Sequence, residues 1–283
     1  MSEVYEALRR SGVELNGEFP EEPAQAPPAL ASALQETEHY QDELPLDQTP
    51  VLQSLFVAQA RLVALSQNGD LGKEKFMVLS TRLKHMQDRH PLKRVIVTSS
   101  LRGEGKSLVS TNLAISLARN TKQKVLLLEG DMRQPSLTRV LSCGERLGLS
   151  DWLQSPDLRS NYLNRLEGLP LWFLFAGTNR ERPMELLQSS RLPQLLGLLG
   201  NSFDWIVVDT PPLTPLADTS VWLRLGDGVL MVVRENHTSK KVLQKAMDNL
   251  SKTPLLSLVL NGANGVEDSY YYTSKVQPNS ARK

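Results

Sequence analysis

A glycine-rich loop between an apolar run and a helical stretch constrains the fold of this chain more than any other feature. The run Val95–Val97 leads into Gly103–Ser107, which reads GEGKS, and a helical pattern follows from Lys106 to Asn120. Backbone N–H groups in such a loop, at the start of a helix, carry partial positive charge and bind phosphate groups. Glycine is needed where the backbone approaches phosphates or adopts a positive φ. The order strand, loop and helix therefore predicts a phosphate-binding loop (P-loop).

The side chains of this loop indicate a nucleoside triphosphate bound with Mg²⁺. The Lys106 ammonium supplies a full positive charge to the β- and γ-phosphates, and the Ser107 hydroxyl is placed to bind Mg²⁺. The usual spacing has a glycine at position 100, where this chain has Ser100. We predict that ATP binds through Gly103, Glu104, Gly105, Lys106, Ser107 and Leu108.

A single carboxylate ends a second apolar run. Trp205–Val208 is followed by Asp209 and then by Thr210–Pro212, as expected for a buried strand that leads into a loop. Mg²⁺ that bridges phosphates needs carboxylate ligands, directly or through water, and in a parallel sheet these lie at the C-terminal ends of strands beside the P-loop. We therefore predict Asp209 as a catalytic residue and metal ligand, the alternative being an aspartate that only caps a turn.

A third apolar run ends in two acidic residues. Val125–Leu128 precedes Glu129 and Asp131, whose side chains share one side of an extended chain because strand side chains alternate. We predict both as catalytic: one polarises an attacking hydroxyl and the other, Asp131, supports Mg²⁺. Arg133 is predicted to contact a phosphate or an acidic substrate surface, and an ordinary salt bridge is its alternative.

Apolar runs alternate with helical patterns along the rest of the chain. Continuous Val, Ile and Leu runs separated by helices indicate an α/β fold of the P-loop NTPase type, with a mostly parallel sheet covered by helices on both faces. Strands are predicted at 94–99, 124–128, 171–176, 205–208, 228–233 and 255–260, and helices at 51–65, 72–89, 106–120, 191–200 and 240–251.

Composition divides the chain into four parts. Residues 1–10 are predicted to form a short docking helix. Residues 11–50 contain no Lys or Arg, many acidic residues and several prolines, which is typical of a disordered linker. The P-loop domain is predicted to span 51–265. The tail 266–283 is polar and predicted to be disordered, although it carries Tyr270, Tyr271 and Tyr272.

Several function classes are disfavoured by the composition. The net charge is only +1, and the tryptophans are not interleaved with basic residues, so we expect no nucleic-acid partner. The four histidines have no metal-binding spacing. The chain has a single cysteine, Cys143, and shows neither a secretory signal pattern nor a long apolar run. These features predict a cytoplasmic protein that reaches a membrane only through a partner.

Together these motifs resemble the bacterial tyrosine kinases of capsule and exopolysaccharide loci, which are relatives of the MinD/ParA-type ATPases. The resemblance covers residues 73–265 and the opening MSEVYEALRR. It rests on four segments: the P-loop, Leu128–Arg133 with Pro135, Pro183–Leu187 and Asp209–Pro212. The second of these is similar to the family motif D-x-D-x-R.

The resemblance implies transfer of the γ-phosphate of ATP to tyrosine, with Mg²⁺ as cofactor. It implies that Tyr270–Tyr272 are the phosphoacceptors, used in trans within a homo-oligomer, and that Asn261 contacts the adenine base. It also implies a transmembrane co-polymerase or activator that recruits the chain to the inner face of the plasma membrane.

Three positions depart from the family pattern. Glu129 stands where the family has aspartate, so this carboxylate reaches one methylene further. Glu74–Ser80 keeps the acidic, aromatic and leucine positions of the ring-forming pattern E-x-Y-R-x-L-R but lacks both arginines. Arg102 replaces a proline of the loop. The sequence therefore predicts a homo-oligomer but leaves open whether it is a ring held by such pairs.

Two other functions fit the same motifs. The first is a regulatory scaffold of the same fold that binds ATP and a membrane partner but transfers phosphate poorly, which Glu129 and the missing arginines favour. The second is a MinD/ParA-type positioning ATPase, which Leu101 disfavours because such proteins resemble K-G-G-x-G-K-[ST] and have a lysine at that position.

Overall fold

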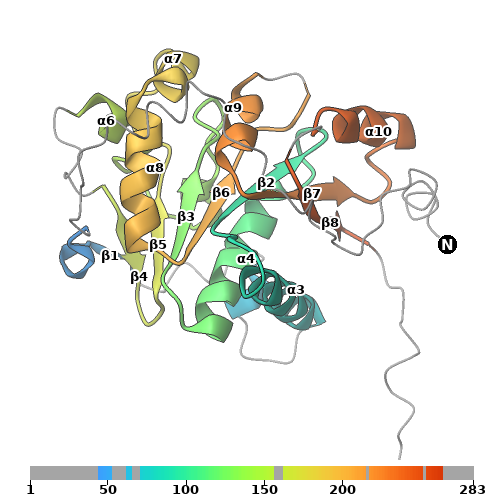
Figure 1. Cartoon of the computed structure of the whole chain (residues 1–283), viewed down its shortest axis with the longest axis horizontal. Coiled ribbons are helices and arrows are strands. Elements are labelled where there is room, and N and C mark those ends of the chain that lie inside the picture. Colours follow the sequence, from blue (N-terminus) through green and yellow to red (C-terminus); the bar gives the residue numbers. More distant parts are fainter. Residues whose placement is uncertain are drawn as a thin grey trace, which may run out of the picture.

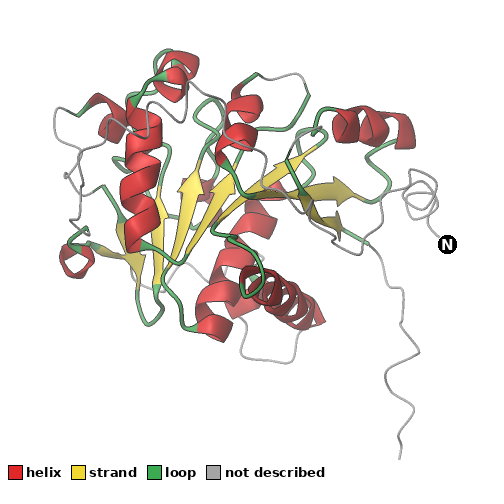
Figure 2. Ribbon diagram, viewed as in Figure 1, coloured by secondary structure: helices red, strands yellow, loops and turns green. Residues whose placement is uncertain are grey.

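A computed structural model describes residues 44–52, 62–65, 71–155, 162–214, 217–250 and 253–263. In these ranges a central sheet lies between two layers of helices (Figure 1; Figure 2). This confirms the predicted α/β fold. The predicted docking helix at 1–10, most of the predicted linker and the tyrosine-containing tail lie outside the described residues.

The sheet has eight strands in the order β1-β4-β5-β3-β6-β2-β7-β8. Every pair of neighbours is parallel except β4 with β5. The P-loop strand β2 lies between β6 and β7, and the two strands that end in acidic residues, β3 and β6, are neighbours. The strands are β1 Val51–Leu52, β2 Arg94–Ser99, β3 Val125–Glu129, β4 Asn164–Leu166, β5 Leu171–Leu174, β6 Trp205–Asp209, β7 Gly228–Arg234 and β8 Leu255–Asn261.

Each face of the sheet is covered by its own set of helices because alternate strand residues point to opposite faces. Val95 and Val97 join a buried cluster with residues of α3, α4 and α5, whereas Ile96 joins a second cluster with residues of α6 to α10. The helices are α3 Leu71–Gln87, α4 Lys106–Thr121, α5 Leu137–Val140, α6 Leu149–Gln154, α7 Pro183–Gln188, α8 Arg191–Ser202, α9 Asp218–Leu225 and α10 Lys240–Asp248.

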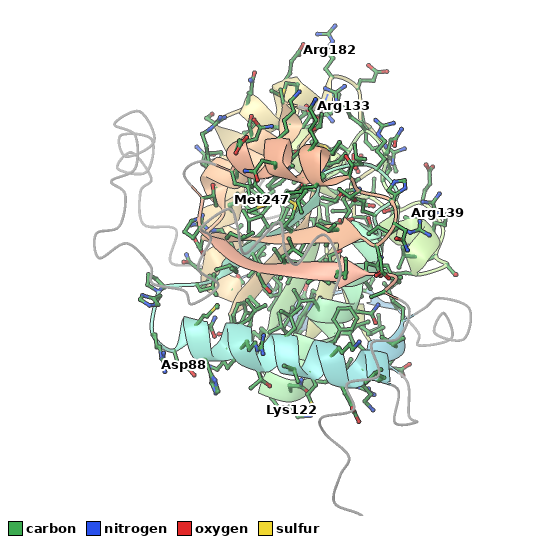
Figure 3. All side chains as sticks on the ribbon, turned by 90° about the vertical axis from the view of Figure 1, so that its right-hand side faces the viewer. Asp88, Lys122, Arg133, Arg139, Arg182 and Met247 are labelled. Atoms are coloured by element: carbon green, nitrogen blue, oxygen red, sulfur yellow. The ribbon has the colours of Figure 1, made fainter. Side chains whose placement is uncertain are left out.

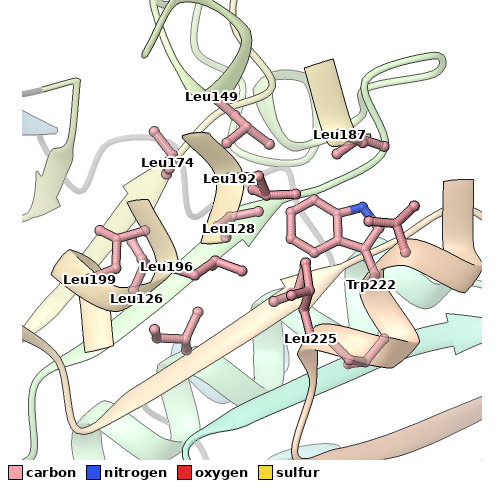
Figure 4. Close-up of a cluster of buried hydrophobic side chains, with 14 of the residues drawn as sticks. Leu126, Leu128, Leu149, Leu174, Leu187, Leu192, Leu196, Leu199, Trp222 and Leu225 are labelled. Atoms are coloured by element: carbon pink, nitrogen blue, oxygen red, sulfur yellow. The ribbon is translucent and has the colours of Figure 1, made fainter. Parts of the chain in front are cut away.

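The second cluster fixes the turn that follows β3. Figure 4 shows the indole of Trp222, from α9, among leucines of β3, α7 and α8. Its Nε1 donates to the carbonyl oxygen of Gly130 at 3.2 Å. A Cβ on Gly130 would lie 2.7 Å from the indole Cε2 atom, so only glycine allows this approach. The core therefore sets the backbone between Glu129 and Asp131.

The start of the domain differs from the prediction. The helix predicted at 51–65 is wrong at both described ends, since Val51–Leu52 pairs with β4 and Val63–Leu65 forms a 3-10 turn (η3). The boundary at residue 50 is also wrong, because Leu44 is buried and its N–H donates to Ser202 Oγ at 3.1 Å. A 3-10 turn follows at Leu46–Gln48 (η1). Burial of apolar side chains thus extends the domain into the acidic stretch.

Among the described residues, no helix is both long enough and apolar enough to cross a bilayer.

Candidate active site

The P-loop connects β2 to α4 and takes its shape from two glycines. Gly103 and Gly105 have φ values of +79° and +90°, a backbone region that residues other than glycine rarely adopt. At Gly105 a Cβ would also lie 2.1 Å from the Nδ2 atom of Asn261. Gly105 is the N-cap of α4, so the first N–H groups of this 16-residue helix face the loop.

The side chain of Glu104 points into the protein and holds the loop in place. Its Oε2 accepts from the Leu101 N–H at 2.8 Å, and the Thr238 hydroxyl donates to its Oε1. Asn261 Nδ2 donates to the Glu104 carbonyl oxygen at 2.8 Å. Burial raises the pKa of Glu104, and these backbone hydrogen bonds oppose the rise. Glu104 and Asn261, both predicted to bind ATP, therefore brace the loop against β8 and the connection between β7 and α10.

Lys106 and Asp131 meet beside the loop. Lys106 Nζ lies 3.4 Å from Asp131 Oδ2, and only 14% and 6% of the two side chains are exposed. The other oxygen, Oδ1, accepts from the Gln134 N–H at 3.0 Å. One face of Asp131 is thus fixed by its own turn while the other faces the P-loop lysine. The structure brings together these two predicted residues.

Asp209 is a buried carboxylate whose two oxygens both lack a hydrogen-bond donor among the described residues. It lies at the end of β6 and is fully buried. Burial raises its pKa to about 7, against the opposing effects of Lys106 and the Ser107 hydroxyl. An unpaired buried carboxylate is costly, so its place beside Ser107 indicates a cationic ligand.

A divalent cation fits this group of residues only together with phosphates. No cluster of three or more His, Cys, Asp or Glu residues in the described ranges could hold a metal by itself. Mg²⁺ is usually bound through one or two carboxylates and the phosphates of its substrate. Ser107, Asp131 and Asp209, the predicted metal ligands, provide such a partial set.

Glu129 has a different environment from the one predicted. Its Oε1 accepts from the N–H groups of Ser136 and Leu137 at 2.5 and 2.7 Å, and its Oε2 accepts from the Ala176 N–H at 3.0 Å. The side chain is fully buried, and burial raises its pKa although these hydrogen bonds lower it. Both oxygens of Glu129 thus bind backbone N–H groups, with three of about four acceptor sites used. Its catalytic role stays a prediction.

Arg133 does not face the P-loop. Its Nε and Nη2 atoms donate to the two oxygens of Asp218 at 2.6 and 3.1 Å, which corrects the predicted phosphate contact. Asp218 is buried at the start of α9, so the pair joins the acidic motif to that helix. Figure 3 shows Arg133 at the same end of the molecule as Arg182.

Ser136 is a site residue that the sequence motifs do not reveal. Its Oγ donates to Ser107 Oγ at 2.7 Å, across 29 positions of sequence. Leu108 is another predicted ATP-binding residue. Its side chain packs against the buried cluster that contains Val95 and Val97, so only its backbone N–H can serve the site. The predicted acceptors Tyr270, Tyr271 and Tyr272 lie outside the described residues.

Comparison with known proteins identifies the family. The chain is 30% identical over 211 residues to the tyrosine-protein kinase CpsD of Streptococcus pneumoniae, a match that covers 74% of this chain and 90% of the relative. The chain belongs to the bacterial tyrosine kinases of capsule and exopolysaccharide biosynthesis. It is also 28% identical over 215 residues to the tyrosine-protein kinase YwqD of Bacillus subtilis, covering 75% of this chain and 90% of that protein. No family model matches the chain.

Solved structures agree with this membership. The tyrosine kinase domain of BceF is 30% identical with a TM-score of 0.63, over 73% of this chain and 84% of that one. The chimerical protein CapA2B2 is 26% identical with a TM-score of 0.65, over 70% of this chain and 88% of that one. The predicted family and P-loop fold are thereby confirmed.

Proposed function

We propose that this bacterial tyrosine kinase transfers the γ-phosphate of ATP to tyrosine residues, including its own, and thereby regulates capsule or exopolysaccharide polymerisation and export. The observation that carries the proposal is the meeting of three features at the ends of β2, β3 and β6. These are the P-loop, the Lys106–Asp131 pair and the unpartnered carboxylate of Asp209.

In this proposal the N–H groups of Gly103–Leu108 and the Lys106 ammonium hold the phosphates. Ser107 and Asp209 would hold Mg²⁺, which would neutralise charge on the phosphates. The tyrosine oxygen forms a bond to the γ-phosphorus, the bond to the β–γ bridging oxygen breaks, and ADP leaves. Asp131, which faces the P-loop lysine, is the carboxylate that would accept the phenolic proton.

Partners are proposed from the same family membership. Tyr270–Tyr272 would accept phosphate in trans from another copy of the chain. Residues 1–10 would dock on a transmembrane co-polymerase at the inner face of the plasma membrane. Deleting these ten residues should weaken recruitment by that partner without changing nucleotide affinity, and unchanged recruitment would contradict the docking role.

Self-association through α3 would differ from an arginine-paired ring. Ser80, at the position of one missing arginine, is buried and bonded to Ser116 Oγ at 3.1 Å. Met77, at the other, is 49% exposed, as is Val78. A contact through this face of α3 would therefore use Met77 and Val78, among exposed charged residues, in place of arginine pairs.

The regulatory scaffold remains the second candidate. One observation favours it: three backbone N–H groups donate to the carboxylate of Glu129. The family has an aspartate of its acidic motif at this position. A scaffold would bind ATP and the membrane partner with little phosphotransfer.

One experiment separates these functions. The full chain is incubated with labelled ATP and Mg²⁺, with and without the cytoplasmic segment of the proposed co-polymerase partner. The kinase predicts tyrosine label that is lost in Lys106→Met and in the variant with Tyr270, Tyr271 and Tyr272 changed to Phe. Nucleotide binding with no label under either condition would contradict the kinase and support the scaffold.

A further inference from the structure

Ser136 stands at the N-cap of α5 but does not cap it. Serine at this position usually accepts a hydrogen bond from the N–H groups of the first helical turn. Here its side chain makes no such bond. Glu129 Oε1 accepts from the N–H groups of Ser136 itself and of Leu137 at 2.5 and 2.7 Å. The hydroxyl of Ser136 is therefore free for another partner.

That partner is the hydroxyl of the P-loop serine. Ser136 Oγ donates to Ser107 Oγ at 2.7 Å, a normal length for two hydroxyls. Ser136 is fixed from both sides, because its backbone N–H is held by Glu129 at the end of β3 while Ser107 lies in the first turn of α4. The bond therefore joins the acidic motif to the P-loop.

This bond sets how Ser107 uses its own atoms. A hydroxyl has one proton and two lone pairs. When Ser136 donates to one lone pair, the Ser107 proton must turn to another acceptor. The second lone pair of Ser107 is left for a cation.

We propose that Ser136 is a positioning residue that orients the Ser107 hydroxyl for Mg²⁺. It acts through Ser107 and does not itself touch the nucleotide. The proposal rests on the proposed function, since it concerns the same metal site. A hydrogen bond that orients a ligand commonly changes metal affinity 10- to 100-fold when it is lost, and a single neutral hydrogen bond is worth about 1 kcal/mol, or roughly fivefold.

The opposing account is that the Ser136–Ser107 bond only attaches α5 to α4. Both accounts predict some loss of stability in Ser136→Ala, so stability cannot separate them. They differ in the Mg²⁺-dependent part of nucleotide binding, which only the positioning role changes.

The test measures the affinity of the full chain for a fluorescent ADP analogue with Mg²⁺ and with EDTA. Four proteins are compared: the unchanged chain, Ser136→Ala, Ser136→Thr and Ser110→Ala. Ser110 is the matched control because its Oγ donates to the carbonyl oxygen of Ser107 at 3.0 Å and does not contact the hydroxyl. Thermal melts of all four confirm folding.

We expect Ser136→Ala to reduce the gain in affinity on adding Mg²⁺ by about 5- to 20-fold, with affinity in EDTA unchanged. Ser136→Thr, which keeps the hydroxyl, and Ser110→Ala should retain the gain. An unchanged gain in Ser136→Ala, an equal loss with and without Mg²⁺, or failure of Ser136→Thr to restore it would overturn the positioning role alone. If the unchanged chain shows no gain with Mg²⁺, the proposed function fails as well.

Discussion

The ends of β3 and β6 lie side by side, and each carries a buried carboxylate, but only one of the two carboxylates is hydrogen-bonded within the described residues. Glu129 and Asp209 are register partners in neighbouring strands, and both carboxylates are buried. Glu129 accepts three backbone hydrogen bonds, whereas Asp209 accepts none from the described residues. Hydrogen bonds offset much of the cost of burying a carboxylate, while one without them lowers stability unless a ligand completes it. Hydrogen bonding thus separates the two roles where position in the sheet does not.

The largest expected effect comes from removing the unsatisfied carboxylate. Asp209→Asn should lower the rate of tyrosine phosphotransfer about 10²- to 10³-fold, because a group that stabilises transition-state charge is lost. Glu129→Gln should cost less than about tenfold, since it keeps the shape of a group that does not face the phosphates. Initial rates of phosphotyrosine formation measure both. A larger loss in Glu129→Gln would reverse the assignment.

Stability should respond in the opposite order. Glu129→Ala leaves the N–H groups of Ser136, Leu137 and Ala176 without their acceptor, so we expect unfolding to become easier by about 2–4 kcal/mol. Urea denaturation at neutral pH gives this difference. As a control, Glu185→Ala alters an exposed residue of α7 and should change stability by less than about 0.5 kcal/mol. Equal stability of Glu129→Ala and the unchanged chain would show that the three hydrogen bonds contribute little.

Asp209 should make the nucleotide-free protein less stable as pH rises. Its folded pKa of about 7 lies above its ordinary value, so the folded state binds more protons than the unfolded state between these limits. Stability therefore falls as pH increases from about 4 to 7, and the loss is complete above pH 7. At pH 8 Asp209→Asn should be more stable than the unchanged chain by on the order of 1–4 kcal/mol, and the difference should shrink towards pH 5. Urea melts without nucleotide at both pH values would show no such trend if Asp209 were solvated.

A smaller effect is expected at the third charged position of the acidic motif. Arg133→Gln breaks a pair in which Asp218 is 3% exposed and Arg133 is 40% exposed. Because the arginine is partly solvated, we expect a loss of about 1 kcal/mol in stability. Nucleotide affinity should not change, since the guanidinium is engaged by α9. A fluorescent-nucleotide titration that showed weakened binding would return Arg133 to the phosphate site. Arg182→Gln, on a residue 77% exposed, serves as the control.

The sequence predicts the features that depend on residues close together in the chain. The P-loop, the acidic strand ends and the six long parallel strands follow from short runs of neighbouring residues. The structure adds short elements such as β4 and α6, whose three and six residues are too few to show a period. Their form depends on packing against β5 and the second cluster.

The roles of Glu129 and Ser136 depend on contacts between distant segments. Nothing in the spacing of the acidic motif indicates that Glu129 turns towards α5 and away from the phosphates. Ser136 stands at a helix N-cap, and the sequence does not indicate that its hydroxyl bonds to Ser107 and not to its own helix. The acidic neighbours of Leu44 predict that it belongs to the linker, although it is buried and its N–H donates to Ser202 of α8.

The Mg²⁺-dependent gain in ADP affinity, measured on the unchanged chain, Asp209→Asn and Glu129→Gln, tests the contrast between the strand ends most directly. The account predicts that Asp209→Asn abolishes the gain, while Glu129→Gln keeps it and melts at a lower temperature than the unchanged chain. Retention of the gain in Asp209→Asn together with its loss in Glu129→Gln would contradict the account.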